Sequence, residues 1–378
     1  MHDFSSTYAS LAKENPIDVL RLIRSENVGP VTFFKLVDYF GTAAKALDTI
    51  PGMAAKGGGK RPLKVADKAQ AEKELETAQG FGAQIILYGS SHYPKMLHAI
   101  HDPPPLIMAL GNPAIWNRKL NIAIVGARNA SANACRFAGK LALDLGAEGI
   151  TVVSGLARGI DGAAHQGSLP SGTVGVIAGG IDTVYPPEHE NLYAKMREEG
   201  AIICEQPFGT APQPRNFPAR NRIISGMSQG VVVVEASLKS GSLITAEMAA
   251  EQNRDVFAVP GSPLDPRCKG TNQLIREGAT LTESMEDILN ALRNRPHLPL
   301  SEPKPADFQV PAASVPNESD LAKARGLVTE KLSADPVLVD ELITQCQLTA
   351  GVVLTVLLEM ELAGRISRHP GNRVSFLF

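Results

Sequence analysis

The sequence is poor in cysteine, and its few cysteines form no recognisable site. Cys135, Cys204, Cys268 and Cys346 are the only four in 378 residues, with no Cys-x-x-Cys pair and no neighbouring histidine cluster. This spacing argues against a zinc site and against a disulfide framework. We therefore expect no metal and a reducing, cytoplasmic location.

Long apolar runs and a dominant charge are also missing. No run reaches the roughly 18 apolar residues of a membrane span, and MHDFSSTYASLAKENP lacks the basic start and apolar stretch of a signal peptide. We expect a soluble, non-exported protein with no membrane partner. Because 37 Lys and Arg nearly balance 39 Asp and Glu, any site for a polyanion has to be local.

The chain is too long for one ordinary core, and its patterns divide it into three domains and a linker. Residues 1–78 are predicted to be helical around an Asn-Val-Gly-Pro turn at 27–30, similar to helix-hairpin-helix and sterile-alpha-motif-like modules. Residues 79–293 form an α/β domain. The Pro-rich segment 294–318 is typical of a linker, and 319–378 has a winged-helix outline.

Short β-branched runs alternate with helical stretches across the α/β domain. They lie at 85–87, 122–125, 151–153, 174–177, 202–203, 231–234 and 256–259. Continuous apolar strands of this kind are buried on both faces. The fold class is therefore predicted to be α/β, with a doubly wound, Rossmann-like parallel sheet and a binding crevice at the carboxyl ends of its strands.

The predicted winged helix has an unusual recognition helix. Its helices are expected at 337–346 and 349–363, followed by a hairpin at 366–376. The segment 349–364 has no Lys or Arg and contains Glu359 and Glu361. Because a recognition helix needs contacts to phosphates and base edges, we expect packing or partner binding there rather than DNA reading.

The loops after the predicted strands are rich in glycine, small hydroxyls and arginine. The residues singled out are Gly126 and Arg128 after one strand, and Ser154, Gly155, Ala157, Arg158 and Gly159 after the next. Glycine lets the backbone approach an anion, helix-start N–H groups point at it, and arginine adds a charged fork. One such loop is explained by tight geometry alone, but converging loops favour a phosphate ligand.

The densest basic stretch points to single-stranded nucleic acid. It contains Arg215, Asn216, Phe217, Arg220, Asn221 and Arg222. Arginine neutralises phosphates and phenylalanine stacks on bases, as in single-strand binders. The alternatives are that Phe217 belongs to the core and that Arg220 or Arg222 pairs with a crevice carboxylate such as Asp161 or Glu235.

A further turn at Ser240, Gly241 and Ser242 suits another phosphate or sugar contact, or an ordinary helix cap.

The Walker and GxGxxG patterns are absent, which disfavours ATP and NAD as ligands. A nucleoside-monophosphate phosphoribohydrolase-like enzyme stays an alternative, with Glu247 and Glu251 as acids. However, Lys-Ser-Gly-Ser at 239–242 replaces the Pro-Gly-Gly-x-Gly-Thr run of such hydrolases.

Several long blocks resemble the successive signatures of the DNA-processing protein A (Smf) family. They are SGLARGIDGAAH, YPPEHENLY, FPARNRIISGMS, VVVVEASLKSGSLITAEMAAEQNRDVFAVPG and GTNQLIREGA, and the resemblance runs from about residue 80 to 290. One departure is Ala127, where the family usually carries Ser or Thr between Gly and Arg. A hydroxyl contact at that position is therefore lost.

The resemblance implies a non-catalytic protein that binds and protects single-stranded DNA, usually as a homodimer, and helps load the RecA recombinase during natural transformation. It places DNA contacts at Gly126, Arg128, the 154–158 turn, Phe217 and Arg220. It implies no cofactor and no catalytic residue, and single-strand-binding protein is a further candidate partner. A recombination adaptor that touches DNA only incidentally is the remaining alternative.

Overall fold

The structure is a computed structural model that describes residues 10–294, 317–369 and 371–377. Within these residues the chain divides into two compact units, one containing 10–16 and 72–294 and the other 17–71 and 317–377. We call them the sheet unit and the terminal unit. The predicted linker at 294–318 lies almost entirely outside the described residues, so the proposed domain boundaries stay predictions.

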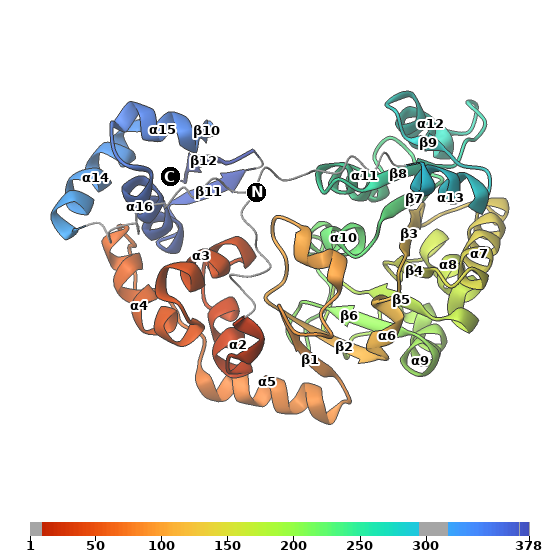
Figure 1. The fold of residues 1–378 in the computed structure, drawn as a ribbon, viewed down its shortest axis with the longest axis horizontal. Helices are drawn as coiled ribbons and strands as arrows, with labels where there is room; N and C mark the ends of the chain where they lie inside the picture. Colours follow the sequence, from red (N-terminus) through yellow and green to blue (C-terminus); the bar gives the residue numbers. More distant parts are fainter. Residues whose placement is uncertain (1–9, 295–316, 370, 378) are drawn as a thin grey trace. The chain divides into compact units, whose positions relative to one another are not determined.

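The sheet unit is built on a nine-stranded sheet with the order β1-β2-β6-β5-β4-β3-β7-β8-β9 (Figure 1). The strands are β1 (Gln84–Leu87), β2 (Leu106–Gly111), β3 (Asn121–Gly126), β4 (Thr151–Ser154), β5 (Thr173–Val176), β6 (Ala201–Cys204), β7 (Gly230–Val234), β8 (Asp255–Ala258) and β9 (Thr280–Leu281). All pairings among β3 to β9 are parallel. The predicted doubly wound α/β class is therefore confirmed.

The sheet departs from the prediction at one edge, where β2 pairs antiparallel with both β1 and β6. Neither β2 nor the two-residue β9 was expected from the sequence. The segment joining β1 to β2 contains only the short 3-10 helix η2 (Lys95–Ala99). A parallel return needs a longer crossover, so the chain comes back antiparallel.

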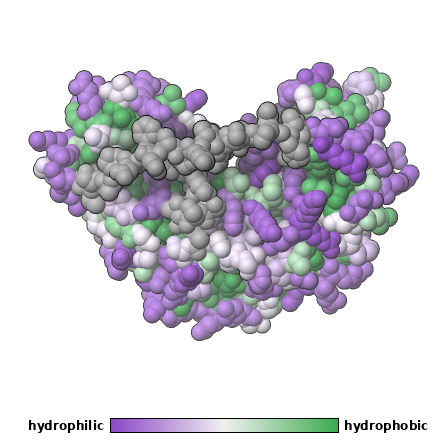
Figure 2. Space-filling view, viewed as in Figure 1, coloured by the Kyte–Doolittle hydropathy of each residue, from purple (hydrophilic) through white to green (hydrophobic). Residues whose placement is uncertain are grey.

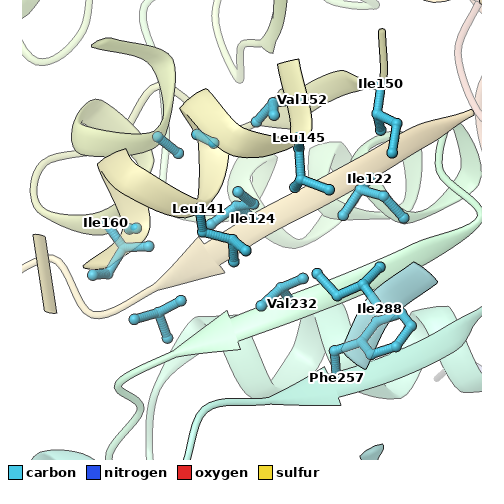
Figure 3. Close-up of a cluster of buried hydrophobic side chains, with 14 of the residues drawn as sticks. Ile122, Ile124, Leu141, Leu145, Ile150, Val152, Ile160, Val232, Phe257 and Ile288 are labelled. Atoms are coloured by element: carbon cyan, nitrogen blue, oxygen red, sulfur yellow. The ribbon is translucent and has the colours of Figure 1, made fainter. Parts of the chain in front are cut away.

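The helices of the sheet unit follow the strands in alternation. They are α6 (Pro113–Trp116), α7 (Ala132–Ala147), α8 (Ile160–Ser168), α9 (Glu190–Glu199), α10 (Asn216–Gly226), α11 (Gly241–Glu251), α12 (Lys269–Arg276) and α13 (Met285–Arg293). One core cluster lies between α7, α8, α13 and the central strands. Figure 3 shows Leu141 and Leu145 of α7 over Ile122 and Ile124 of β3.

The strand order reverses between β3 and β7, because β4 to β6 follow on one side of β3 and β7 to β9 on the other. Ligands of open α/β sheets commonly bind at such a switch point. At this point β3 and β7 pack closely, because a Cβ on Gly126 would lie 1.9 Å from the carbonyl oxygen of Val234. Glycine at position 126 therefore lets the ends of these two strands pair closely.

The terminal unit combines the N-terminal helices with the winged helix. Its N-terminal helices are α2 (Pro16–Arg24), α3 (Pro30–Phe40), α4 (Ala43–Lys56) and the start of α5 (Lys68–Gly80). The C-terminal part has α14 (Glu318–Lys331), α15 (Val339–Cys346) and α16 (Ala350–Leu362), with a sheet β10-β12-β11 formed by β10 (Val337–Leu338), β11 (Ile366–His369) and β12 (Arg373–Phe376). The winged helix is confirmed; α14 and β10 were not expected from the sequence.

The surface drawn in Figure 2 is mostly hydrophilic, with smaller groups of hydrophobic residues. Among the described residues, no single helix is long and apolar enough to cross a membrane. Helices α15 and α16 together meet the length and composition limits but are bent by 118° at their junction. Their apolar side chains build the core of the winged helix.

Candidate nucleic-acid interface

Three loops of the sheet unit meet over the carboxyl ends of β3 to β6. The backbone N–H of Ile160 donates to the carbonyl of Ala127 at 3.3 Å, which joins the loop after β4 to the loop after β3. Gly159 makes this contact possible, because a Cβ there would lie 2.3 Å from the same carbonyl oxygen. The start of α10 joins these loops through Arg220, whose guanidinium donates to the carbonyl of Gly155.

A cation–aromatic stack lies at this meeting point. The guanidinium carbon of Arg128 is 4.9 Å from the ring centroid of half-buried Phe217, and that of Arg220 is 6.0 Å away. The ring of Tyr185 lies 5.8 Å from that of Phe217, tilted by 57°. Tyr185 is 47 % exposed, and Arg128 is also exposed. The structure thus brings Arg128 and Phe217, predicted from separate loops, into one place.

A pocket opens beside this stack. Its lining combines small residues with the aromatic rings and one arginine: Gly155, Ala157, Ile177, Ala178, Gly179, Thr183, Tyr185, Pro212, Phe217 and Arg220. The glycines are closely packed, because a Cβ on Gly155 would lie 2.7 Å from Nη1 of Arg220 and one on Gly179 would lie 2.8 Å from the carbonyl oxygen of Thr210. The rings of Tyr185 and Phe217 offer flat apolar faces. The two rings and Arg220 thus line one small pocket.

Arg220 organises the base of the site rather than its surface. It is 6 % exposed, and Nη1 donates to the carbonyls of Gly155 and Val176. Burial lowers the pKa of this guanidinium to about 10, while the nearby Asp161 acts in the opposite direction. Burial likewise raises the pKa of Asp161, opposed first by the charge of Arg220. The sequence alternative that Arg220 is electrostatically paired with Asp161 is therefore supported.

Internal carboxylates occupy the N–H groups that we expected to face phosphate. Oδ2 of Asp161 accepts from the backbone N–H of Gly155 at 3.2 Å and of Ala157 at 3.3 Å. Glu235 accepts from the backbone N–H and the hydroxyl of Ser131, at 2.8 and 2.6 Å, where α7 begins. The expectation that these groups are available to a ligand phosphate was wrong. The N–H groups of Ser131, Gly155 and Ala157 therefore have partners within the chain.

The structure separates the remaining predicted arginines. Arg222 is 7 % exposed; its Nη2 donates to both carboxylate oxygens of Glu205 at 2.7 Å, and Nε lies 3.1 Å from Asp102. These bonds commit it to an internal ion-pair network, away from a ligand. Arg215 and Arg158 are exposed, and Arg158 forms a surface salt bridge with Glu188. Surface pairs of this kind are weak, so Arg158 can exchange its partner for a phosphate.

The predicted polar residues have mainly structural partners. The hydroxyl of Ser154, fully buried, donates to the carbonyl of Ile124 at 2.6 Å. The amide of Asn216 donates to the carbonyl of Ala178 at 3.2 Å, and the side-chain oxygen of Asn221 accepts from Arg220 at 3.2 Å. Ser240 caps α11 by accepting from the backbone N–H of Ser242 at 3.4 Å. Gly241, also predicted as a contact, is exposed at the same turn.

Sequence reasoning missed Tyr185 and Thr183 as members of the site. Both follow β5, outside the glycine, hydroxyl and arginine patterns that pointed to the other loops. The signal was present in the block YPPEHENLY, which opens with an aromatic residue ahead of two prolines. An exposed aromatic residue in a loop after a strand suits base stacking.

His165 is an internal residue and is not placed as an acid or base at the site. It is fully buried on α8, with Nδ1 2.9 Å from Oγ1 of Thr173. Burial lowers the pKa of His165 to about 3, assisted by the charges of His189 and Arg220. Its folded pKa thus lies well below the ordinary value of about 6.5.

Acid is therefore expected to destabilise the sheet unit through His165. Between pH 6.5 and 3 the unfolded chain binds a proton that the folded chain does not, so stability should fall as pH falls through this window. His165→Gln should lower stability at pH 7 yet flatten the decrease between about pH 6.5 and 4, measured by denaturant unfolding. The control is His101→Gln at an exposed position. Equal acid sensitivity in wild type and His165→Gln would contradict the assignment.

The two acids of the enzyme alternative lie on the surface. Glu247 and Glu251 are both exposed on α11. Among the described residues, Glu235, Asp265 and Cys268 form one group compact enough for a metal, with candidate ligand atoms within 4.8 Å. Glu235 already holds Ser131, Arg267 bonds Asp265 at 2.7 Å, and burial raises the pKa of Cys268. These contacts disfavour metal binding by this group.

The fold and this arrangement define a mostly parallel α/β sheet domain, accompanied by N-terminal helices and a winged helix, with cationic and aromatic groups at one loop cluster. Comparison with protein families agrees. Residues 84–293 match the model of DNA recombination-mediator protein A, 13–77 match a DprA-like N-terminal HHH domain, and 311–372 match a DprA winged helix domain. The chain belongs to the DNA recombination-mediator protein A family, whose members are DNA-processing recombination mediators.

Relatives and solved structures extend this match. The chain is 44 % identical to DNA processing protein DprA of Bacillus subtilis over 216 residues, covering 57 % of this chain and 73 % of the relative. It is 37 % identical to Protein Smf of Escherichia coli over 293 residues, covering 77 % and 76 %. The structure of DNA processing protein A from Streptococcus pneumoniae aligns with a TM-score of 0.57 at 30 % identity, covering 77 % of this chain and 98 % of that one.

A second solved structure names a ligand. DNA processing protein A from Helicobacter pylori, described for its unique single-stranded DNA binding mode, aligns with a TM-score of 0.51 at 27 % identity. The match covers 56 % of this chain and 95 % of that one.

Proposed function

We propose that this chain binds and protects single-stranded DNA at the loop cluster of Arg128, Tyr185 and Phe217, and helps load the RecA recombinase onto it during natural transformation and recombination. The observation that carries the proposal is the stack of Arg128 on Phe217, with the exposed ring of Tyr185 beside it. A cation for phosphate and flat rings for bases are the two elements that single-strand binders combine. The ligand named for the Helicobacter pylori relative supports the same choice.

The geometry favours a single strand over two other ligands. A duplex keeps its base faces stacked inside, so aromatic rings gain little from it. A free nucleotide would seek backbone N–H groups at helix starts, but Asp161 and Glu235 already accept from those at Gly155, Ala157 and Ser131. An unpaired strand needs only exposed cations and accessible rings, which this site supplies.

The direct test of this proposal compares an unstructured oligonucleotide with a blunt duplex in anisotropy titrations over a range of salt concentrations. We expect preferential single-strand binding with little base preference. The logarithm of the binding constant should fall linearly with the logarithm of the salt concentration, with a slope of about 0.7 for each phosphate that the protein contacts. Equal affinity for the duplex would contradict the proposal, and strand affinity too weak to measure without partner proteins would favour an adaptor role.

We further propose that the protein acts as a homodimer and turns over neither DNA nor nucleotides. The exposed edge strand β9 supports self-association, because Leu281 on it is 46 % exposed and Leu264 is 91 % exposed in the loop after β8. Sedimentation velocity would show a dimer, and a strictly monomeric protein would contradict this part.

The described site contains no arranged pair of carboxylates and no activated nucleophile, which supports the lack of turnover. Magnesium-dependent nuclease or nucleotide hydrolysis by the pure protein would contradict it.

The proposed protein partners follow from family membership rather than from a surface of this chain. RecA is the expected recipient of the strand, with single-strand-binding protein as a further candidate. RecA filament assembly on strands covered by single-strand-binding protein should accelerate when this chain is added. Unchanged assembly, together with intact single-strand binding, would contradict loading while leaving DNA binding in place.

A further inference from the structure

The recognition helix of the winged helix, α16, is buried on more sides than its own domain accounts for. Val353, Val356 and Leu357 pack into the core that it shares with α14 and α15. Leu358, Glu359 and Leu362 lie outside that core cluster but are only 4 %, 2 % and 1 % exposed. A helix that is buried nearly all round has a second packing surface.

The N-terminal helices of the terminal unit provide that second surface. Gly57, directly after α4, lies so close that a Cβ would be 2.1 Å from the carbonyl oxygen of Glu359. The side-chain amide of Asn27 donates to the carbonyl of Leu362 at 3.0 Å. The hydroxyl of Thr32 on α3 donates to Glu361 at 2.7 Å. Segments more than 300 residues apart therefore meet along the last turns of α16.

The acidic residues that argue against DNA reading by α16 have partners within the protein. Glu359 accepts from Arg325 at 2.7 and 2.9 Å, and Glu361 accepts from Arg368 at 2.7 Å in addition to Thr32. Glu318, at the start of α14, pairs with Lys56 at 2.7 Å. Carboxylates in this position repel a phosphate backbone but satisfy hydroxyl and cationic groups of a protein surface.

We propose that α16 is an intramolecular docking helix whose partner is the N-terminal helical domain of the same chain, so that the two terminal domains act as one module. Gly57, Asn27 and Thr32 contact α16 along its last turns, at Glu359, Leu362 and Glu361. The inference does not rest on the proposed single-strand binding, because every contact lies within the terminal unit.

Zero-length carbodiimide cross-linking of the full-length protein tests the docking. The reagent joins a lysine to a carboxylate only when the two are in contact, and Lys56 and Glu318 are 2.7 Å apart. We expect a Lys56–Glu318 cross-link by mass spectrometry. When isotopically labelled and unlabelled chains are mixed, it should join peptides of the same label only. The Lys140–Asp144 pair within α7, 2.6 Å apart, serves as an internal reference.

Two glycines of the α4 region give a matched pair of variants. Gly57→Leu places a side chain against α16, although the backbone of Gly57, with φ −69° and ψ 0°, is open to any residue. Its cross-link yield should fall about tenfold, because a clash of this kind shifts the docking equilibrium. Gly52→Leu, inside α4 with nothing within 4 Å of its Cβ, should keep the full yield.

A charge swap keeps the test decisive if Gly57→Leu fails to fold. K56E alone removes the cross-link chemistry, whereas the double variant K56E/E318K should restore a cross-link between the same two positions. A wild-type protein without the cross-link, a double variant that fails to restore it, or an undiminished yield in folded Gly57→Leu would overturn the proposal. Cross-links joining differently labelled chains would assign the docking surface to a second copy instead.

Discussion

Replacing Phe217 with alanine is expected to weaken single-strand binding by roughly 1–3 kcal/mol, on the order of 5- to 150-fold. The ring is half-buried between Arg128 and Tyr185, so its loss removes a stacking face and also the support of the Arg128 guanidinium. Arg128→Ala should weaken binding too and reduce the salt slope by about one phosphate's worth. Fluorescence anisotropy with a labelled oligonucleotide measures both effects.

The contact between the two side chains adds an expectation that their separation in the sequence concealed. Because the Arg128 guanidinium carbon lies 4.9 Å from the Phe217 ring centroid, the two losses should not add. The double variant should lose less than the sum of the single variants, with a coupling of about 0.5 kcal/mol or more. Purely additive losses would show that Arg128 and Phe217 act at separate places on the strand.

A core role for Phe217 makes a different prediction. Truncating a buried aromatic ring costs about 3–5 kcal/mol of stability, which would lower the melting temperature and leave affinity unaltered in the folded fraction. Phe137→Ala is the matched control, because Phe137 packs partly buried against the core cluster rather than at the candidate site. It should lower thermal stability with normal DNA affinity. A thermally unaltered Phe217→Ala with normal affinity would refute the stacking role.

Gly159→Ala is expected to damage both the fold and the site. Gly159 has φ +72° and ψ −120°, a conformation that costs other residues about 1–3 kcal/mol. The added methyl group would also lie 2.3 Å from the carbonyl oxygen of Ala127 and 2.7 Å from that of Arg128. Overpacking of this kind costs roughly another 1–3 kcal/mol. Both the free energy of unfolding and the strand affinity should fall, because the clash separates the loops that position Arg128.

Gly149→Ala separates backbone strain from this clash. Gly149 also has a positive φ, +73°, but a Cβ at this position would have no atom within 4 Å, and Gly149 is distant in sequence from the loop that carries Arg128. This variant should lose some stability in denaturant titrations while binding DNA as wild type does. If Gly159→Ala binds DNA as tightly as Gly149→Ala, the contact between the loops after β3 and β4 does not position the site.

Much of the sheet was predictable because its central strands are buried on both faces and therefore form continuous apolar runs in the sequence. The two-residue β9 was not, since two residues carry no periodicity. The antiparallel β2 was missed because alternation of strands and helices favours a parallel sheet throughout. Local sequence patterns were enough to predict the winged helix, and α16 begins only one residue after its predicted start.

The candidate site was predictable in its composition but less so in its electrostatics. The sequence singled out Arg128 and Phe217 separately, and the structure shows that they meet, because both follow strands of one sheet. They could not show that Asp161 accepts from the N–H groups of Gly155 and Ala157, nor that Arg222 is committed to Glu205. Which charges pair is decided by tertiary packing. Ala127, where the family usually carries a hydroxyl residue, contributes through its backbone, because its carbonyl accepts from the N–H of Ile160.

The central claim, that an unpaired strand stacks at the loop cluster of Arg128, Tyr185 and Phe217, is tested most directly by photo-cross-linking. An oligonucleotide in which thymines are replaced by 5-iodouracil is bound to the protein and irradiated, and the adduct-bearing peptides are identified by mass spectrometry. We predict adducts on Tyr185 or Phe217, abolished at Phe217 by Phe217→Ala and suppressed by an excess of unlabelled single strand. Adducts confined to the winged helix or to the N-terminal helices would contradict the claim.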